Sequence, residues 1–94
     1  MQFVIVGDDG EGALEKRKAA RPDHLAYWKD QGARFLAAGP FVDGAGVPTG
    51  SLIVIEADSR EQAEQLAAGD PYVTRGIFAR HTVRGWNWLF GRPE

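Results

Sequence analysis

The chain has 94 residues, a length that suits one globular domain. Of these residues 44% are hydrophobic and 26% charged, a composition that excludes a disordered chain. Its formal net charge is −2 at pH 7, which gives no basis for expecting a nucleic-acid partner. It contains no cysteine, which excludes disulfides, thiolate nucleophiles and cysteine-based metal sites.

The first half of the chain predicts a strand, a helical region and a second strand. Phe3–Val6 (FVIV) is rich in β-branched residues and is followed by the turn cluster DDGEG. Residues 13–33 have a helix-favouring composition, and Pro22 interrupts them; the residues at three- and four-residue steps are Leu14, Lys18, Arg21, Leu25, Trp28 and Gly32. Because the residue before a proline avoids the α conformation, we expect a short first helix, a break near Arg21 and a second helix that starts with Pro22. Arg34–Phe41 is short and apolar, and it predicts a strand.

The second half predicts a loop, two strands and two helical segments. VDGAGVPTG is a loop, Ser51–Ala57 (SLIVIEA) is the clearest strand in the chain, and Ile77–Val83 (IFARHTV) is the last strand. Between these strands, residues 59–68 predict a helix that has its serine as the N-cap. Asp70 followed by Pro71 predicts the cap and the first position of a single helical turn.

This order, β-α-β-β-α-β, predicts an α+β fold of the ferredoxin-like type, with an antiparallel sheet and helices on one of its faces. We expect one domain over residues 1–94, with an aromatic C-terminal tail at residues 85–94. FVIV and LIVI do not alternate apolar and polar residues, so both faces of the sheet are apolar. Since two helices cover only one face, we expect the other face to pack against a second copy, which gives a homodimer joined through its sheet faces.

The tail carries three aromatic residues at alternate positions, Trp86, Trp88 and Phe90. They are too apolar to be left in water, which leaves three arrangements. The aromatic side chains cover a groove, contact the partner subunit or fold back on their own domain.

Sequence signals for membranes and metals are absent. The beginning MQFVIVG lacks the basic region of a signal peptide, and no apolar run approaches the ~20 residues of a membrane span. The two histidines have no HxxxH or HxH spacing, and GDDGEG has too few spaced oxygen ligands for calcium. We therefore expect a cytoplasmic protein with no membrane partner and no metal site.

One stripe of the predicted helical region combines cations with an imidazole. Steps of three and four residues place Arg17, Arg21, His24 and Trp28 on one face, provided that the helix is continuous. Two guanidinium groups beside an imidazole suit the binding of a small anionic molecule near a proton-transfer group. The alternative is a solvated basic face that includes a histidine.

Asp70 has a sufficient structural role as a helix cap, and spacing alone does not connect it with His24. A contact between them would fix the imidazole tautomer and make His24 a general acid or base near neutral pH. Ser51 is not in a nucleophile-elbow motif, but its hydroxyl is a candidate ligand donor. His81 lies within a predicted strand and is expected to pack or to lie at the surface.

Several segments in a fixed order, LEKRKAARPDHL, AAGPF, TGS and ADSREQAEQLAAGDPYVTRGIF, resemble the YciI-like (YCII-related) family. The resemblance runs from Met1 to about Phe90, and RPDHL, AGP and DPY are its most specific parts. It implies a ferredoxin-like α+β fold that assembles as dimers of the dimeric α/β-barrel kind. This agrees with the two apolar faces of the predicted sheet.

The resemblance also implies a site with a histidine–aspartate pair in a cleft. By motif, the histidine is His24 of RPDHL and the aspartate is Asp70 of DPY. A better understood relative removes HCl from a chlorinated hydroquinone, and muconolactone isomerase, which has a similar fold, transfers protons on small rings. Four further residues match family positions around the cleft and are candidates for substrate binding: Arg17, Arg21, Ser51 and Tyr72.

The leading hypothesis is a small cofactor-free enzyme of lyase, hydrolase or isomerase type that acts on a small anionic organic substrate. His24 would transfer a proton, Asp70 would orient it, and Arg17 or Arg21 would hold the negative charge of the substrate. One alternative is a non-catalytic dimeric module for ligand binding or an accessory role. The other is a dimeric-barrel cofactor-independent monooxygenase, which requires a deep pocket lined by the tail aromatics.

Overall fold

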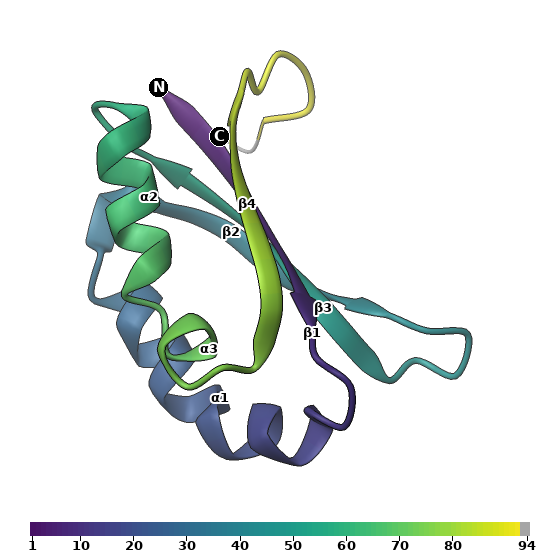
Figure 1. The fold of residues 1–94 in the computed structure, drawn as a ribbon. Coiled ribbons are helices and arrows are strands. Elements are labelled where there is room, and N and C mark those ends of the chain that lie inside the picture. Colours follow the sequence, from purple (N-terminus) through teal and green to yellow (C-terminus); the bar gives the residue numbers. More distant parts are fainter. Residues whose placement is uncertain (93–94) are drawn as a thin grey trace.

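The structure is a computed structural model that describes residues 1–92, and it is built around a four-stranded antiparallel sheet with helices against one face (Figure 1). Its strands are β1 (Gln2–Asp9), β2 (Phe35–Val42), β3 (Pro48–Glu56) and β4 (Phe78–Trp86). Its helices are α1 (Leu14–Lys29), the 3₁₀ helix η1 (Gly32–Arg34), α2 (Arg60–Ala68) and the short α3 (Pro71–Thr74). The strand order is β2-β3-β1-β4, and every neighbouring pair is antiparallel. The predicted order of elements and the ferredoxin-like α+β class are confirmed.

The predicted break in the first helix is wrong. Helix α1 runs without interruption through Pro22, which lacks the N–H that would bond to the carbonyl of Lys18. Both residues are exposed, so water can bind that carbonyl. A proline inside a helix costs about 3 kcal/mol, and burial of side chains on both sides of it offsets this cost. The buried residues of α1 are Arg17, Ala20, His24 and Trp28.

The inner face of the sheet forms the main core together with α1 and α2. On β1, the buried Phe3 and Ile5 alternate with the half-buried Val4 and Val6, so the two pairs face opposite sides. The inner side chains pack against Trp28 at the end of α1 and against the alanines of α2. The core residues from the strands are Phe3, Ile5, Ile53, Ile55 and Val83.

The outer face of the sheet lies opposite the helices (Figure 1), and it carries apolar side chains on β1, β2 and β3, whereas β4 contributes Thr82 and Arg84. Val4 and Val6 of β1 pair with Val54 and Leu52 of β3, and Leu52 is 36% exposed. Phe41 at the end of β2 extends this surface and is 40% exposed. The strands β1 and β3 therefore present apolar residues on both faces of the sheet, and the described helices cover only the inner face.

The tail begins later than predicted. Strand β4 continues through Trp86, which pairs with Gln2 of β1, so residues 85 and 86 belong to the sheet. The backbone N–H of Trp88 donates a hydrogen bond to the Gln2 side chain at 3.4 Å, and its ring lies 5.3 Å from that of Trp86. Phe90 is 95% exposed. The tail thus folds back as far as residue 88, and its last two residues, 93–94, lie outside the described part.

The N-caps of the two helices in the second half of the chain are the predicted ones. The side chain of Ser59 accepts a hydrogen bond from the backbone of Gln62 at 3.1 Å and caps α2. Asp70 caps α3 in the same way, and Pro71 occupies the first turn. Within the described residues, each helix is too short or too polar to cross a membrane.

Candidate functional site

His24 and Asp70 form the centre of the site. They are 46 residues apart in sequence, and His24 Nδ1 lies 2.8 Å from Asp70 Oδ1. His24 is 6% exposed and Asp70 1% exposed. The contact arises because His24 is on the inner face of α1 and Asp70 lies at the start of α3, which packs against α1. An imidazole and a carboxylate therefore meet away from bulk water.

Asp70 accepts three hydrogen bonds, which fix its orientation. Its Oδ1 accepts from the backbone N–H of Tyr72 at 2.9 Å as well as from His24, and its Oδ2 accepts from Trp28 Nε1 at 2.9 Å. Because Asp70 is the acceptor, we assign the hydrogen of the neutral imidazole to Nδ1. This tautomer leaves Nε2 of His24 with a lone pair that can accept a proton.

The ring of Tyr72 lies against His24. The two rings stack with centroids 3.8 Å apart and an angle of 10° between their planes. The guanidinium carbon of Arg17 lies 4.6 Å from the centroid of the Tyr72 ring. Burial raises the pKa of the Tyr72 phenol above its ordinary value of 10.0, and the Arg17 charge partly opposes that rise. Tyr72 therefore presents a protonated hydroxyl at neutral pH.

Arg17 is held by the carboxylate of Asp9, which was not among the predicted site residues. Its NH1 donates to Asp9 Oδ1 at 2.8 Å and to Oδ2 at 3.0 Å, and its NH2 donates to Ser51 Oγ at 2.5 Å. The side chains of Arg17 and Asp9 are both 7% exposed. The charge of Arg17 is thus balanced within the protein, so Arg17 is less suited than a free cation to hold a substrate anion. Sequence offered no signal for Asp9 beyond its place in a turn cluster.

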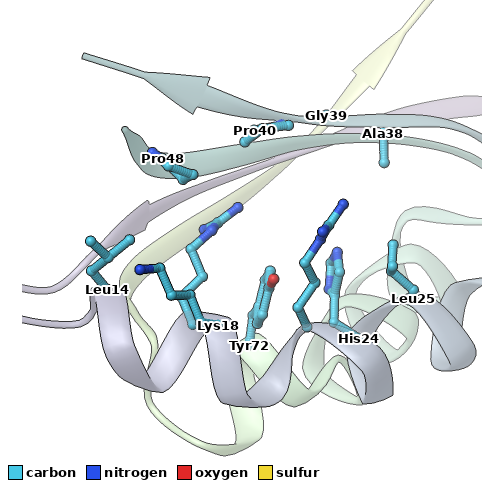
Figure 2. Close-up of a pocket in the computed structure, with 11 residues that line it drawn as sticks. Leu14, Lys18, His24, Leu25, Ala38, Gly39, Pro40, Pro48 and Tyr72 are labelled. Carbon is cyan, nitrogen blue, oxygen red and sulfur yellow. The ribbon is translucent and has the colours of Figure 1, made fainter. Parts of the chain in front are cut away.

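A cavity of about 450 Å³ lies between α1 and the strands β2 and β3 (Figure 2). Figure 2 shows His24 and Tyr72 projecting from the helical layer into this space, with Ala38 and Pro40 on the strands opposite. The cavity is lined by Leu14, Arg17, Lys18, Arg21, His24, Leu25, Ala38, Gly39, Pro40, Pro48 and Tyr72.

The structure brings the six predicted site residues together in two layers. Four of them line the cavity: Arg17, Arg21, His24 and Tyr72. Asp70 and Ser51 lie behind them, bonded to His24 and Arg17 respectively. The tail aromatics are not part of the lining, so the first of the three arrangements expected for them, covering a groove, is not observed at this cavity within one chain. Among residues 1–92, no three acidic or histidine side chains gather as metal ligands.

His24 and Tyr72 each present one polar atom to the cavity. Nε2 of His24 and the hydroxyl of Tyr72 have no hydrogen-bond partner among the described residues. Every fully buried side-chain nitrogen or oxygen in that part of the chain does have a partner. These two atoms must therefore reach the cavity surface, where a ligand or water can bind them.

Comparisons with known proteins agree on one family. The model of the YCII-related domain matches residues 1–87. Protein YciI of Escherichia coli O6:H1 is 39% identical over 99 aligned positions, which cover 96% of this chain and 100% of that protein. An uncharacterized protein of Haemophilus influenzae is 37% identical with the same coverage.

Solved structures show the same fold. The 5-chloro-2-hydroxyhydroquinone dehydrochlorinase TftG of Burkholderia phenoliruptrix, in complex with 2,5-dihydroxybenzoquinone, superposes with a TM-score of 0.85 and 29% identity. The match covers 93% of this chain and 94% of TftG. An antibiotic biosynthesis monooxygenase superposes with a TM-score of 0.54 and 21% identity over 88% of this chain and 93% of its own, a similarity of fold alone.

Proposed function

Since this chain belongs to the YCII-related domain family, we propose that it is a small enzyme that transfers protons on a small hydroxylated ring compound, with His24 as the acid–base group. The observation that carries the proposal is the buried contact between His24 and Asp70 beside a cavity. A cavity of about 450 Å³ is of the size that small-molecule sites have. The proposed steps use only side chains of this chain.

The roles of the two residues follow from their geometry. Asp70 accepts from Nδ1 and is itself held by two further donors, so the imidazole keeps one orientation and one tautomer. When Nε2 takes a proton, the carboxylate 2.8 Å from Nδ1 stabilises the imidazolium. His24 thereby acts as the base, and then as the acid.

The substrate class is supported by the similarity to TftG, whose name specifies a chlorinated hydroxyhydroquinone. A hydroxyl of such a ring gives its proton to Nε2 of His24, and the electron pair left on oxygen delocalises into the ring. The imidazolium then protonates a ring carbon, which completes a tautomerisation. Where that carbon carries chlorine, departure of chloride and release of a proton from a second hydroxyl complete the loss of HCl.

The test uses 5-chloro-2-hydroxyhydroquinone as the probe and compares the two histidines of the chain. His24→Gln removes the acid–base group, so we expect turnover to fall by about 10²–10⁴-fold. His81→Gln is the control, because His81 lies on β4 and is not part of the cavity lining. Turnover should stay within about twofold of the wild-type rate in this control, as for most substitutions away from a site.

Three results of this test would reject the proposal or redirect it. Equal rates for wild type and His24→Gln would remove His24 from the chemistry. Binding of 2,5-dihydroxybenzoquinone without turnover of the chlorinated probe would favour the alternative of a non-catalytic ligand-binding module. No turnover and no binding by the wild type would reject the hydroxylated-ring class. The monooxygenase alternative requires a pocket lined by the tail aromatics, and none of them lines this cavity.

We further propose that a second copy of the chain covers the outer sheet face. The apolar side chains Val4, Val6 and Leu52 lie on that face, and two sheets packed in this way would remove them from water. The expected mass in sedimentation equilibrium is twice the chain mass of 10.3 kDa. Leu52→Glu should give the monomer mass, whereas Leu25→Glu, at an exposed position on α1, should leave the dimer intact. A wild-type monomer would contradict the proposal.

A further inference from the structure

The hydroxyl of Tyr72 reaches the cavity surface, and the described residues supply no partner for it. Tyr72 is 1% exposed and lines the cavity. Its hydroxyl makes no hydrogen bond with any described residue, whereas the hydroxyl of Tyr27, the other tyrosine, donates to the carbonyl of Leu66 at 2.7 Å. Every fully buried side-chain nitrogen or oxygen among residues 1–92 has a partner, so this unpaired hydroxyl is accessible from the cavity, where a ligand can bind it.

The ring of Tyr72 is fixed by its neighbours, so the hydroxyl has a defined position. His24 stacks on it at 3.8 Å, and Phe78 contacts it edge-on with centroids 5.6 Å apart. The guanidinium of Arg17 lies 4.6 Å from the ring centroid. Figure 2 shows Tyr72 beside His24, with both side chains directed toward the space below the strands. A donor held in this way loses little freedom when it binds a ligand.

Arg21 supplies a positive charge to the same cavity. It lies three residues before His24 on α1 and lines the cavity, and no carboxylate of the described residues lies within 4.0 Å of its guanidinium nitrogens. Arg17 differs, because Asp9 balances its charge. Lys18 lies at 3.7 Å from Glu15, and both are well exposed. Arg21 is therefore the cavity-lining guanidinium that remains available to an anionic ligand.

We propose that the Tyr72 hydroxyl and the Arg21 guanidinium form an oxyanion-binding subsite beside Nε2 of His24, which takes a phenolate or enolate oxygen of a planar ring ligand. The ligand class rests on the proposed function, whereas the subsite itself is a binding claim. When Nε2 removes a proton from the ring, negative charge grows on a ring oxygen. A neutral phenol donor and a cation stabilise that oxygen more strongly as its charge grows, which favours proton transfer.

The test measures binding of 2,5-dihydroxybenzoquinone, an acidic hydroxyquinone that is anionic at neutral pH, by isothermal titration calorimetry. Tyr72→Phe removes only the hydroxyl, and Arg21→Gln removes the charge at an exposed position where folding is not at risk. A hydrogen bond to a charged group corresponds to about a 10- to 150-fold change in Kd, so each variant should bind at least about tenfold more weakly. Tyr27→Phe and Lys29→Gln are the matched controls, with Kd within about twofold of wild type.

The absorption spectrum of the bound probe gives a second measurement, which a purely structural role would not change. Donors to the oxyanion favour the ionised probe, so on acidification it should stay ionised to lower pH in the wild-type complex than in the complex with Tyr72→Phe. Unchanged Kd for Tyr72→Phe and for Arg21→Gln would overturn the subsite, and so would a wild-type protein that does not bind the probe.

Failure of the subsite and failure of the proposed function give different results. His24→Gln should still bind the probe, because binding requires no proton transfer. Binding that depends on Tyr72 and Arg21, without any turnover of the chlorinated probe, would support the subsite and reject the enzyme. Turnover that depends on His24, with probe binding indifferent to Tyr72 and Arg21, would support the enzyme and reject the subsite.

Discussion

Replacing Asp70 by alanine tests the network on which the site depends. The substitution removes the N-cap of α3, which is the hydrogen bond that the Tyr72 backbone N–H donates to the Asp70 side chain. Such a cap stabilises the folded protein by about 1 kcal/mol. The substitution also leaves two buried donors without an acceptor, Nδ1 of His24 and Nε1 of Trp28, at about 1–3 kcal/mol each. These contributions add up to about 3–7 kcal/mol. The variant also no longer has to bury a carboxylate, which acts in the opposite direction. We therefore expect the free energy of unfolding to fall by about 3–4 kcal/mol.

The assay is urea unfolding followed by far-ultraviolet circular dichroism. A chain of this size has about 5–14 kcal/mol of stability, so Asp70→Ala should fold with a much lower urea midpoint and an unchanged m-value. Ser59→Ala is the control, because Ser59 is an exposed cap whose side chain accepts only the bond from Gln62. The free energy of unfolding of this control should fall by about 1 kcal/mol. Equal losses in the two variants would contradict this expectation, since they would mean that Asp70 acts only as a cap.

Three further predictions concern Asp9, Pro22 and the tyrosines. Asp9→Ala leaves Arg17 as a buried cation without its carboxylate and should lower the free energy of unfolding by about 3–5 kcal/mol in the same assay; a loss under about 1 kcal/mol would contradict the buried pair. Pro22→Ala should restore a helix hydrogen bond and raise stability by about 2 kcal/mol, and an unchanged or lower urea midpoint would contradict this. The pKa values of Tyr27 and Tyr72 are both raised above 10.0, chiefly by burial. Stability should therefore be intact below pH 10.0 and fall as the pH rises above it, with tyrosinate absorbance appearing at higher pH than in the urea-unfolded chain.

Local features of the sequence were sufficient for most of the fold. FVIV and LIVI predicted strands because β-branched residues favour a pleated backbone, and their lack of alternation predicted two apolar faces. Ser59 and Asp70 predicted helix starts because a cap depends only on residues within one turn. The predicted break at Pro22 was wrong, since the local preference of a proline was outweighed by the burial of side chains on both sides of it.

The site was only partly predictable. His24 and Asp70 were paired through the resemblance of RPDHL and DPY to a family, whereas spacing alone left them unconnected. Arg17 or Arg21 was expected to hold a substrate anion, but the partner of Arg17, Asp9, is visible only once β1 and α1 are folded together. Because Asp9 balances the charge of Arg17, the oxyanion subsite proposed above uses Arg21 instead.

Sequence was enough to predict the order of strands and helices, the helix caps and the excess of apolar surface, because each depends on residues that are close along the chain. Three features became visible only in the folded chain: the continuity of α1, the pairing of Arg17 with Asp9 and the exposure of the Tyr72 hydroxyl to a cavity. Folding also brought His24 within 2.8 Å of a carboxylate 46 residues away. The physical reason is that charge balance, burial and hydrogen-bond satisfaction are properties of the packed chain and have no local signature in the sequence.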